Sequence, residues 1–189
     1  MTKAGQRQHW VSALRWAEAG CLLAQGTILA FATIATPPAQ AQTFTLLHSF
    51  TGGADGADPS GSLIGDAAGN LYGTTLGGGT YYQGVVFQLN KSGETVLYSF
   101  TDGADGAGPY AGLVRDAAGN LYGTTADGGA HDQGVVFKLN ETGETVLHSF
   151  TGADGAGPSG SLIGDAAGNL YGTTPDSGGS LGVVFKLAP

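Results

Sequence analysis

The stretch Asp116-Ala-Ala-Gly-Asn-Leu-Tyr-Gly-Thr-Thr125 decides the fold of this chain, because the same ten residues occur three times. The other two copies occupy residues 66–75 and 165–174, at spacings of 50 and 49 residues. Self-similarity at such a period is typical of a repeat architecture. The chain from residue 43 onward therefore divides into repeats at about 51–100, 101–150 and 151–187, preceded by a partial copy at 43–50.

The repeated stretch begins with a turn and continues as a strand. Asp116 can accept hydrogen bonds from the backbone a few residues on, and Gly119 can adopt a positive φ. The pattern predicts a hairpin turn between a short strand at 113–114 and a second strand at 121–125. Gly123 inside the second strand indicates close approach by a neighbouring element, or a bulge.

Two further strands complete each repeat, at 134–139 and 145–150 in the middle copy. Side-chain alternation places Val85, Phe87 and Leu89 on one face of their strand and Val86 on the other. The same rule places Val96, Tyr98 and Phe100 together, opposite Leu97. Apolar residues on both faces indicate sheets sandwiched between neighbours. We therefore expect an all-β, β-propeller-like fold of three four-stranded blades, each of about 50 residues.

The partial copy Thr43–Phe50 matches the last strand of each repeat, which the third repeat lacks after Leu187. We expect this N-terminal strand to complete the last blade and leave no open edge. Three blades are fewer than the four to eight that propellers normally have. Three alternatives therefore stay open: two or more chains forming one ring, with two giving six blades; a piece of a longer array; or a β-trefoil.

Residues 1–41 differ in kind from the repeats. A basic start is followed by a mostly apolar run from Cys21 to Thr36 and by Ala39-Gln40-Ala41. This order predicts a secretory signal peptide cleaved after Ala41, and hence a secreted or cell-envelope protein; an uncleaved anchor or a disordered tail is the alternative.

The mature chain would be Gln42–Pro189, without Cys. It carries four Lys or Arg against 14 Asp or Glu, a formal net charge of −10. This charge argues against nucleic acid as a partner and against electrostatic docking on anionic lipid. We expect no membrane insertion after signal cleavage.

Three motifs resemble the GloVer tandem repeat: Leu121-Tyr-Gly-Thr-Thr125, Gly134-Val-Val-Phe-Lys-Leu139 and Leu147-His-Ser-Phe150. In the preceding repeat, the copy of the third motif is followed by Asp105-Gly106. That repeat belongs to bacterial surface or secreted proteins with a choice of anchors. The resemblance covers residues 43–187 and implies a propeller-like fold and export. It implies no established activity, and there are no catalytic residues to carry over.

Residues that differ between the copies are the candidates for ligand binding. They lie in the loop between the second and third strands, as Tyr81-Tyr82 and His131-Asp132, and at Tyr110 in the loop that follows the fourth strand. Exposed aromatic residues beside acidic groups on a loop rim can bind a sugar or a peptide. The alternative is loop variation without function.

Acidic residues on the same rim are candidates for a calcium site. Oxygen ligands on Gly-rich loops suit a hard cation such as Ca²⁺, and the predicted ligands are Asp102, Asp105, Asp127 and Asp154. Their spacing matches neither the EF-hand series nor the nonapeptide repeat, so solvated turn residues are the alternative. The rings at His48, Tyr98 and His148 share one repeat position and are expected to pack in the core.

The sequence thus predicts an exported repeat module with a structural or binding role towards a protein or glycan. The alternative is an exported glycan-active hydrolase or lyase that uses acidic loop residues. His131 with Asp127 and Asp132 is the only local acid–base grouping, and no nucleophile elbow is present.

Overall fold

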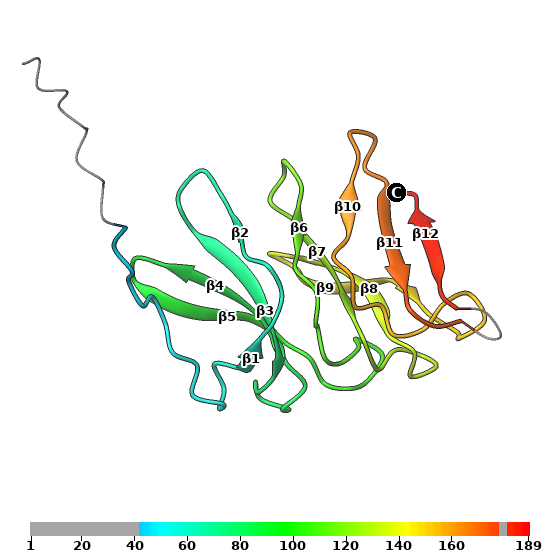
Figure 1. Ribbon diagram of the computed structural model, residues 1–189, viewed down its shortest axis with the longest axis horizontal. Coiled ribbons are helices and arrows are strands. Elements are labelled where there is room, and N and C mark those ends of the chain that lie inside the picture. The colour runs from blue at the N-terminus through cyan, green and yellow to red at the C-terminus, as the bar shows by residue number, and fades with distance from the viewer. Residues whose placement is uncertain (1–41, 178–180) are drawn as a thin grey trace, which may run out of the picture. The chain divides into compact units, whose positions relative to one another are not determined.

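The computed structural model describes residues 42–177 and 181–189, and the predicted signal peptide at 1–41 lies outside the described residues. Residues Phe44–Pro189 form one compact unit, in which the described residues contain no helix and build three antiparallel sheets (Figure 1). The first sheet holds β1 Ala57–Pro59, β2 Ile64–Gly65, β3 Leu71–Gly77, β4 Val85–Asn90 and β5 Gly93–Ser99; the second holds β6 Val114–Arg115, β7 Leu121–Thr125, β8 Val135–Asn140 and β9 Gly143–Ser149; the third holds β10 Ile163–Gly164, β11 Leu170–Thr174 and β12 Val183–Leu187.

Strand pairing stays within each repeat, in the order of the chain. In the second sheet the order is β6-β7-β8-β9, and β2 through β5 pair in the same succession in the first sheet. The strands predicted around 121–125, 134–139 and 145–150 are confirmed to within two residues. β1 was not predicted. It pairs with the end of β3, where Pro59 lies opposite Thr75, whereas β2 pairs with the beginning of β3, where Ile64 lies opposite Tyr72.

The turn that opens the repeated stretch is built as its residues predict. In the second sheet, Asp116 accepts hydrogen bonds through its carboxylate from the Asn120 main chain at 2.9 Å, the Asn120 side chain at 2.6 Å and the Tyr122 hydroxyl at 3.0 Å. Gly119 has a φ of 91°, a conformation that glycine adopts without strain. In the first copy, the hydrogen bond from the Asn70 side chain is the main cause that lowers the pKa of Asp66 to about 2.

The last strands of the first two sheets, β5 and β9, contain an irregularity that the alternation rule missed. Val86 pairs with Tyr98, but the next residue, Phe87, pairs with Val96, so Leu97 is an extra residue in β5. Such a bulge reverses the phase of the strand. The prediction that Val96 and Tyr98 share a face is therefore wrong: Val96 packs with Phe87, whereas Tyr98 packs with Val86 on the opposite face.

The sheets stack face to face, and two hydrophobic clusters lie at their junctions. Val86 and Phe100 of the first repeat pack with Leu113, Leu121 and Phe137 of the second. Val136 and Phe150 pack in the same way with Leu162 and Leu170 of the third. Both faces of the middle sheet are thus buried, as the apolar pattern predicted.

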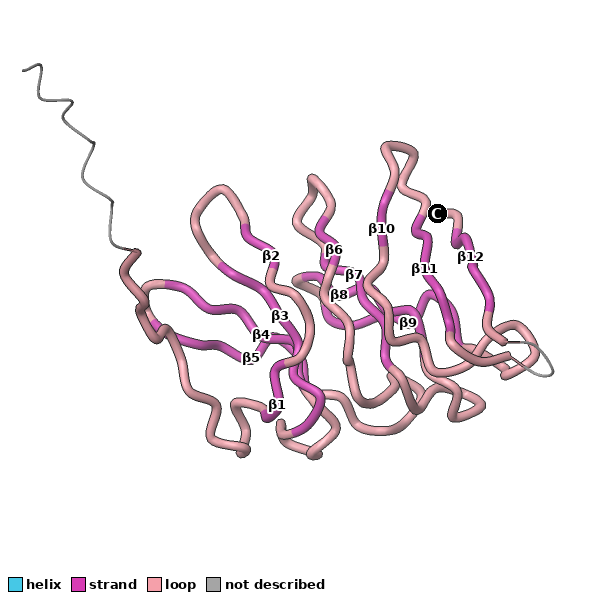
Figure 2. The backbone as a smooth tube through the Cα atoms, in the orientation of Figure 1, coloured by secondary structure: helices cyan, strands magenta, loops and turns pink. Residues whose placement is uncertain are grey.

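The long loops at one end of the sheets are tied to the next repeat through the main chain. The Gly108 N–H donates to the Gln83 carbonyl at 3.0 Å, and the Gly157 N–H donates to the Gln133 carbonyl at 3.0 Å. Figure 2 shows these loops at the end of the sheets opposite the β2–β3, β6–β7 and β10–β11 turns. The two ends of the sheets therefore present different surfaces.

The N-terminal segment 43–50 is not a strand in this structure, and it does not complete the third sheet within the chain. A strand needs a ladder partner; residues 43–47 are exposed, and Phe50 at the end of the segment packs on the first sheet, with its ring centroid 5.0 Å from that of Phe87. The expected closure of the last blade by this strand is therefore wrong for the single chain.

Candidate functional site: a polar cleft between the first two sheets

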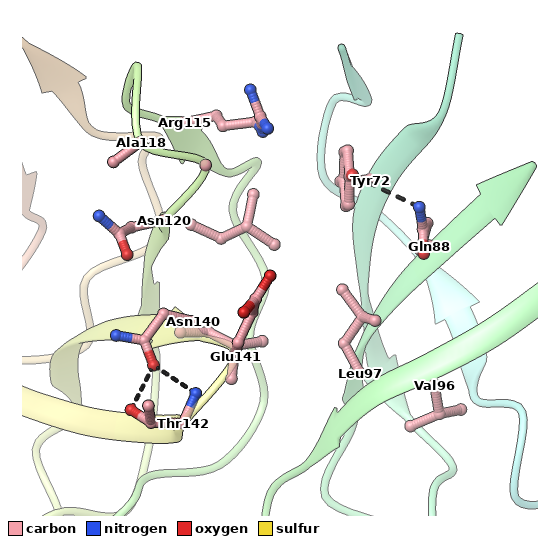
Figure 3. A pocket seen from close by; sticks show the side chains of 13 residues that line it. Tyr72, Gln88, Val96, Leu97, Arg115, Ala118, Asn120, Asn140, Glu141 and Thr142 are labelled. Atoms are coloured by element: carbon pink, nitrogen blue, oxygen red, sulfur yellow. Dashed lines mark hydrogen bonds between the residues drawn. The ribbon is translucent and has the colours of Figure 1, made fainter. Parts of the chain in front are cut away.

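A cleft of about 770 Å³ opens between the first and second sheets. Figure 3 shows Tyr72, Gln88, Val96 and Leu97 of the first sheet on one wall, facing a second wall that comes from the β6–β7 and β8–β9 turns. The labelled side chains of that second wall are Arg115, Ala118, Asn120, Asn140, Glu141 and Thr142. The volume of the cleft is within the range of about 300–1,000 Å³ that is typical of small-molecule sites.

One residue that lines the cleft occurs once in the three repeats. Arg115 ends β6, where the other copies have Gly65 and Gly164. Its guanidinium lies 5.9 Å from the centre of the Tyr72 ring, across the junction between the sheets. The corresponding hollow between the second and third sheets, which has Gly164 on one wall, measures about 170 Å³.

The contact of Arg115 with Tyr72 replaces one that the other copies make within a single sheet. Lys138 lies 5.8 Å from the centre of the Tyr122 ring, and Lys186 lies 5.7 Å from that of Tyr171. In the first repeat this lysine position is Gln88, whose amide donates to the Tyr72 hydroxyl at 3.4 Å. A cation over the tyrosine face is attractive, and here the cation comes from the neighbouring repeat.

The side chains that line the cleft offer both donors and acceptors of hydrogen bonds. Arg115 contributes donors, Glu141 contributes acceptors, and the amide of Gln88 contributes both. Asn140 accepts from the Thr142 N–H at 2.9 Å, which holds the β8–β9 turn that carries Glu141. Leu97 adds an exposed apolar surface on the opposite wall. This combination suits a polar ligand with apolar patches.

The predicted ligand-binding residues lie at the other end of the sheets. Tyr81, Tyr82, Tyr110, His131 and Asp132 are all exposed, in the loops that are joined by the main-chain bonds of Gly108 and Gly157. The loop of Tyr81 and Tyr82 is thus brought beside the loop of Tyr110. None of these five residues lines either described cleft, so the predicted rim is an open surface.

The predicted calcium ligands are engaged in loop hydrogen bonds. Asp105 accepts from the Thr101 N–H at 2.9 Å and from the Tyr98 hydroxyl at 3.0 Å, and Asp154 accepts from the Thr151 N–H at 2.8 Å. Asp102 lies 3.4 Å from the Gln83 amide, while Asp127 pairs with Ala107 through its main chain. Within residues 42–177 and 181–189, no three His, Cys, Asp or Glu side chains come together as a metal-binding group.

The shared ring position at 48, 98 and 148 is both packed and polar. His148 lies edge-on to Phe150 at 4.8 Å, and Tyr98 lies likewise to Phe100 at 5.1 Å. The Nε2 of His148 also contacts the Asp154 carboxylate at 3.0 Å. The ring packing agrees with the sequence prediction, and the carboxylate contact anchors the following loop to the strand.

A carboxyl group at the junction of the first two sheets escaped the sequence reasoning. Burial, with the negative charge of Asp105 adding to it, raises the pKa of Glu144 to about 7. One of its carboxylate oxygens is buried without a hydrogen-bond partner. The corresponding Glu94 also has a raised pKa because of burial. A carboxyl whose pKa is near neutral can exchange protons at physiological pH.

Two signals in the sequence mark the residues that were missed. Arg115 is a basic residue at a position where both other copies have glycine, and Glu144 belongs to a Gly-Glu-Thr sequence that occurs twice. Neither signal by itself indicates that the side chain faces a neighbouring sheet.

A family model described as the Gloeobacter/Verrucomicrobia repeat matches residues 17–189. This match confirms the resemblance that the repeated motifs indicated. No curated protein matches the chain at a significant level. Among the described residues, no helix has the length and apolar character needed to cross a membrane.

Proposed function

The chain belongs to the Gloeobacter/Verrucomicrobia repeat family, and on that premise we propose that it is an exported, non-catalytic binding module of propeller-like architecture. We propose further that the cleft between the first two sheets binds an oligosaccharide. A repeat domain whose copies share one scaffold is well suited to a binding or structural role, because the scaffold can carry residues that differ between copies.

The propeller-like part of the proposal is supported by the way the sheets are built. Each sheet is a meander from one repeat, and successive sheets bury their faces against each other. Blades of a propeller are arranged in this way. The β-trefoil alternative is less well supported, since the described strands pair only within their own repeat.

Export is supported by the order of residues in 1–41: basic start, apolar run and Ala-x-Ala site. A net charge of −10 in residues 42–189 suits a soluble protein outside the cell. Mass spectrometry of the protein recovered from a bacterial periplasm or medium tests this part. An N-terminus at Gln42 is expected, and an intact Met1 on protein retained in the cytoplasm would contradict export.

The observation that carries the proposed ligand is the cleft itself (Figure 3). Sugars present hydroxyl groups that donate and accept hydrogen bonds, together with apolar C–H faces. Arg115, Gln88 and Glu141 offer matching donors and acceptors, and Leu97 offers an apolar contact. A few placed polar groups among apolar walls are characteristic of small-molecule sites.

The test is a glycan array followed by titration of the bound glycan with wild type and Arg115→Gly. The substitution installs the residue that the chain itself uses at 65 and 164, so the fold should tolerate it. Loss of a hydrogen bond to a charged group should weaken binding by about tenfold or more. The matched control Arg115→Lys keeps the charge and should bind more tightly than the glycine variant.

Other outcomes of the same experiment identify the alternatives. Binding lost in Tyr81→Ala and Tyr82→Ala but retained in Arg115→Gly would place the site on the loop rim. Binding that requires Ca²⁺ would support a metal among the loop carboxylates. Shortened glycan products would overturn the non-catalytic reading in favour of the hydrolase or lyase alternative.

One observation favours that alternative enough to name its acid. Burial raises the pKa of Glu144 to about 7, with the negative charge of Asp105 adding to the shift, and a carboxyl that is protonated near neutral pH is the general acid of glycoside hydrolysis. If glycan cleavage is found, Glu144→Gln should abolish it. Cleavage unchanged in this variant would exclude Glu144 as the acid.

A further inference from the structure

We propose that a second copy of this chain supplies its residues 44–50 as the fourth strand of the β10–β12 sheet, so that two chains join head to tail into one ring. The proposal goes beyond glycan binding and does not depend on it. The internal junctions of the chain provide the evidence, because they show what covers each sheet where a neighbour is present.

The third sheet exposes a strand edge and a face that are covered in the other two sheets. Among the described strands, β12 pairs only with β11, whereas β4 and β8 also pair with the last strand of their sheet. Val184 of β12 is 82% exposed, while its counterparts Val86 and Val136 are fully buried against the next sheet. Ile163 on β10 is exposed as well.

The first sheet exposes the complementary surface. Leu113 and Leu162 pack against the preceding sheet at the two internal junctions, where they are 4% and 3% exposed. Their counterpart Leu63 is 50% exposed, because no sheet precedes it in the described residues. The two outer faces of the unit thus carry the two halves of the same junction.

The end of segment 44–50 packs on the first sheet in the same way as the end of the first repeat's last strand packs on the second sheet. The ring centroids of Phe50 and Phe87 are 5.0 Å apart at 67°, against 5.1 Å and 65° for Phe100 and Phe137. The Thr51 N–H donates to Asp55 at 2.8 Å, as Thr101 donates to Asp105. Anchoring at this end leaves Leu46, 69% exposed, and its neighbour Leu47 without a packed sheet beside them.

The internal repeats also set the register of the proposed pairing. In the second sheet Val136 pairs with His148, Phe137 with Val146 and Lys138 with Thr145. By repeat position, Val184 of one chain pairs with His48 of the other, Phe185 with Leu46, and Lys186 with Thr45. The apolar Leu46 then occupies the place of Val96 and Val146.

A second copy is a better source of the strand than the same chain. The segment is docked on the first sheet, and the second sheet lies between that sheet and β12, packed against both. Closure within one chain would need a ring of three blades, whereas propellers have about four to eight. Two chains with two equal junctions give six.

Light scattering of the full chain tests the assembly. Wild type should have the mass of two chains, and Val184→Lys and Leu46→Lys should each have the mass of one, because a charge then enters an apolar junction. Tyr82→Lys places a charge at an exposed apolar residue outside the proposed junction and should keep the mass of two chains. Circular dichroism should show that all three variants retain β structure, since these side chains are exposed in the single chain.

Three results would overturn the proposal. These are a wild-type protein with the mass of one chain, Val184→Lys and Leu46→Lys both with the mass of two chains, and open assemblies larger than two chains. The last result would contradict closure at two chains.

A disulfide tests the register and the donor chain together. In a Cys21→Ser background, chains with His48→Cys and chains with Val184→Cys are co-expressed and oxidised. Paired residues on antiparallel strands have Cα atoms about 4.5–5.5 Å apart, which a disulfide can span. A cross-linked pair of chains is expected.

The matched control combines Thr45→Cys with Val184→Cys, two positions that are out of register. It should cross-link poorly. Equal cross-linking in the control would contradict the register. A disulfide that forms only when both cysteines are in one chain would show that the strand comes from the same chain, and would overturn the proposal.

Discussion

Replacing Gly123 by alanine should destabilise the protein because its strand passes directly over an aromatic ring. A Cβ atom at Gly123 would lie 2.6 Å from Cζ of Phe137 and 2.9 Å from Cδ2 of Leu113. Both side chains are almost fully buried in the cluster between the first two sheets. Overpacking of a rigid core costs about 1–3 kcal/mol. Alanine also lowers the entropy of the unfolded chain, which offsets about 0.4–1 kcal/mol.

The expected net loss is therefore about 1–2 kcal/mol in the free energy of unfolding. Gly77→Ala, in the corresponding strand β3, is the matched control. Its added Cβ would have Ala57 as its nearest neighbour, at 3.8 Å, which is ordinary van der Waals contact. This control should leave stability unchanged or raise it by up to about 1 kcal/mol.

Urea unfolding followed by circular dichroism measures both variants, at equal protein concentration because the chain is proposed to assemble. A second arm adds Phe137→Leu, which removes the ring atoms nearest the new methyl group. The double variant should be more stable than the sum of the two single changes predicts, by about 1 kcal/mol. If Gly123→Ala and Gly77→Ala have the same midpoint, the close approach is not what requires glycine in this strand.

Three further predictions test other parts of the structure. Glu144→Gln should stabilise the protein at pH 8 but not at pH 4. Burial raises the folded-state pKa of Glu144 from the usual 4.5 to about 7, so the stability of the wild type falls as the pH rises from 4.5 to 7. Because Glu144 is only partly buried, about 1 kcal/mol is expected from urea midpoints at the two pH values; parallel pH profiles would contradict this. Asp116→Ala removes the acceptor of three hydrogen bonds and should cost about 1–2 kcal/mol in the same assay, whereas an unchanged midpoint would mean that the turn forms without its carboxylate. Phe137→Ala should cost about 3–4 kcal/mol, and in single chains carrying Val184→Lys the half-buried Phe185→Ala should cost clearly less; equal losses in that background would mean that Phe185 is packed in the single chain as tightly as Phe137.

Local chemistry accounts for the parts of the fold that could be predicted. The turn at Asp116 needs only a carboxylate, a glycine and an asparagine within five residues, all of which are in the sequence. The strands at 121–125 and 135–140 follow from short apolar runs bounded by such turns. The glycine at 123 indicated close approach before its neighbour was known, and Phe137 is that neighbour.

The candidate site could not be predicted in the same way. Its two walls come from different repeats, from residues 72–97 and 115–142, and a glycine-to-arginine difference between repeats does not say which sheet the side chain will face. The raised pKa of Glu144 in β9 depends likewise on burial in the folded protein, and then on the charge of Asp105 from a distant loop. Residues that vary in long loops drew attention to the opposite end of the sheets.

The sequence by itself determined the repeat, its four-strand unit and the turn that opens each copy, because these depend on contacts between residues a few positions apart. Only the tertiary structure decided the phase of the last strand, since the extra residue Leu97 is defined by its pairing with β4. It also decided the state of segment 43–50: the residues that form strands at 95–99 and 145–149 form none here, because strand structure requires a partner and not only a suitable sequence. The cleft at Arg115 exists for a related reason, because it belongs to the junction between two sheets and not to either repeat alone.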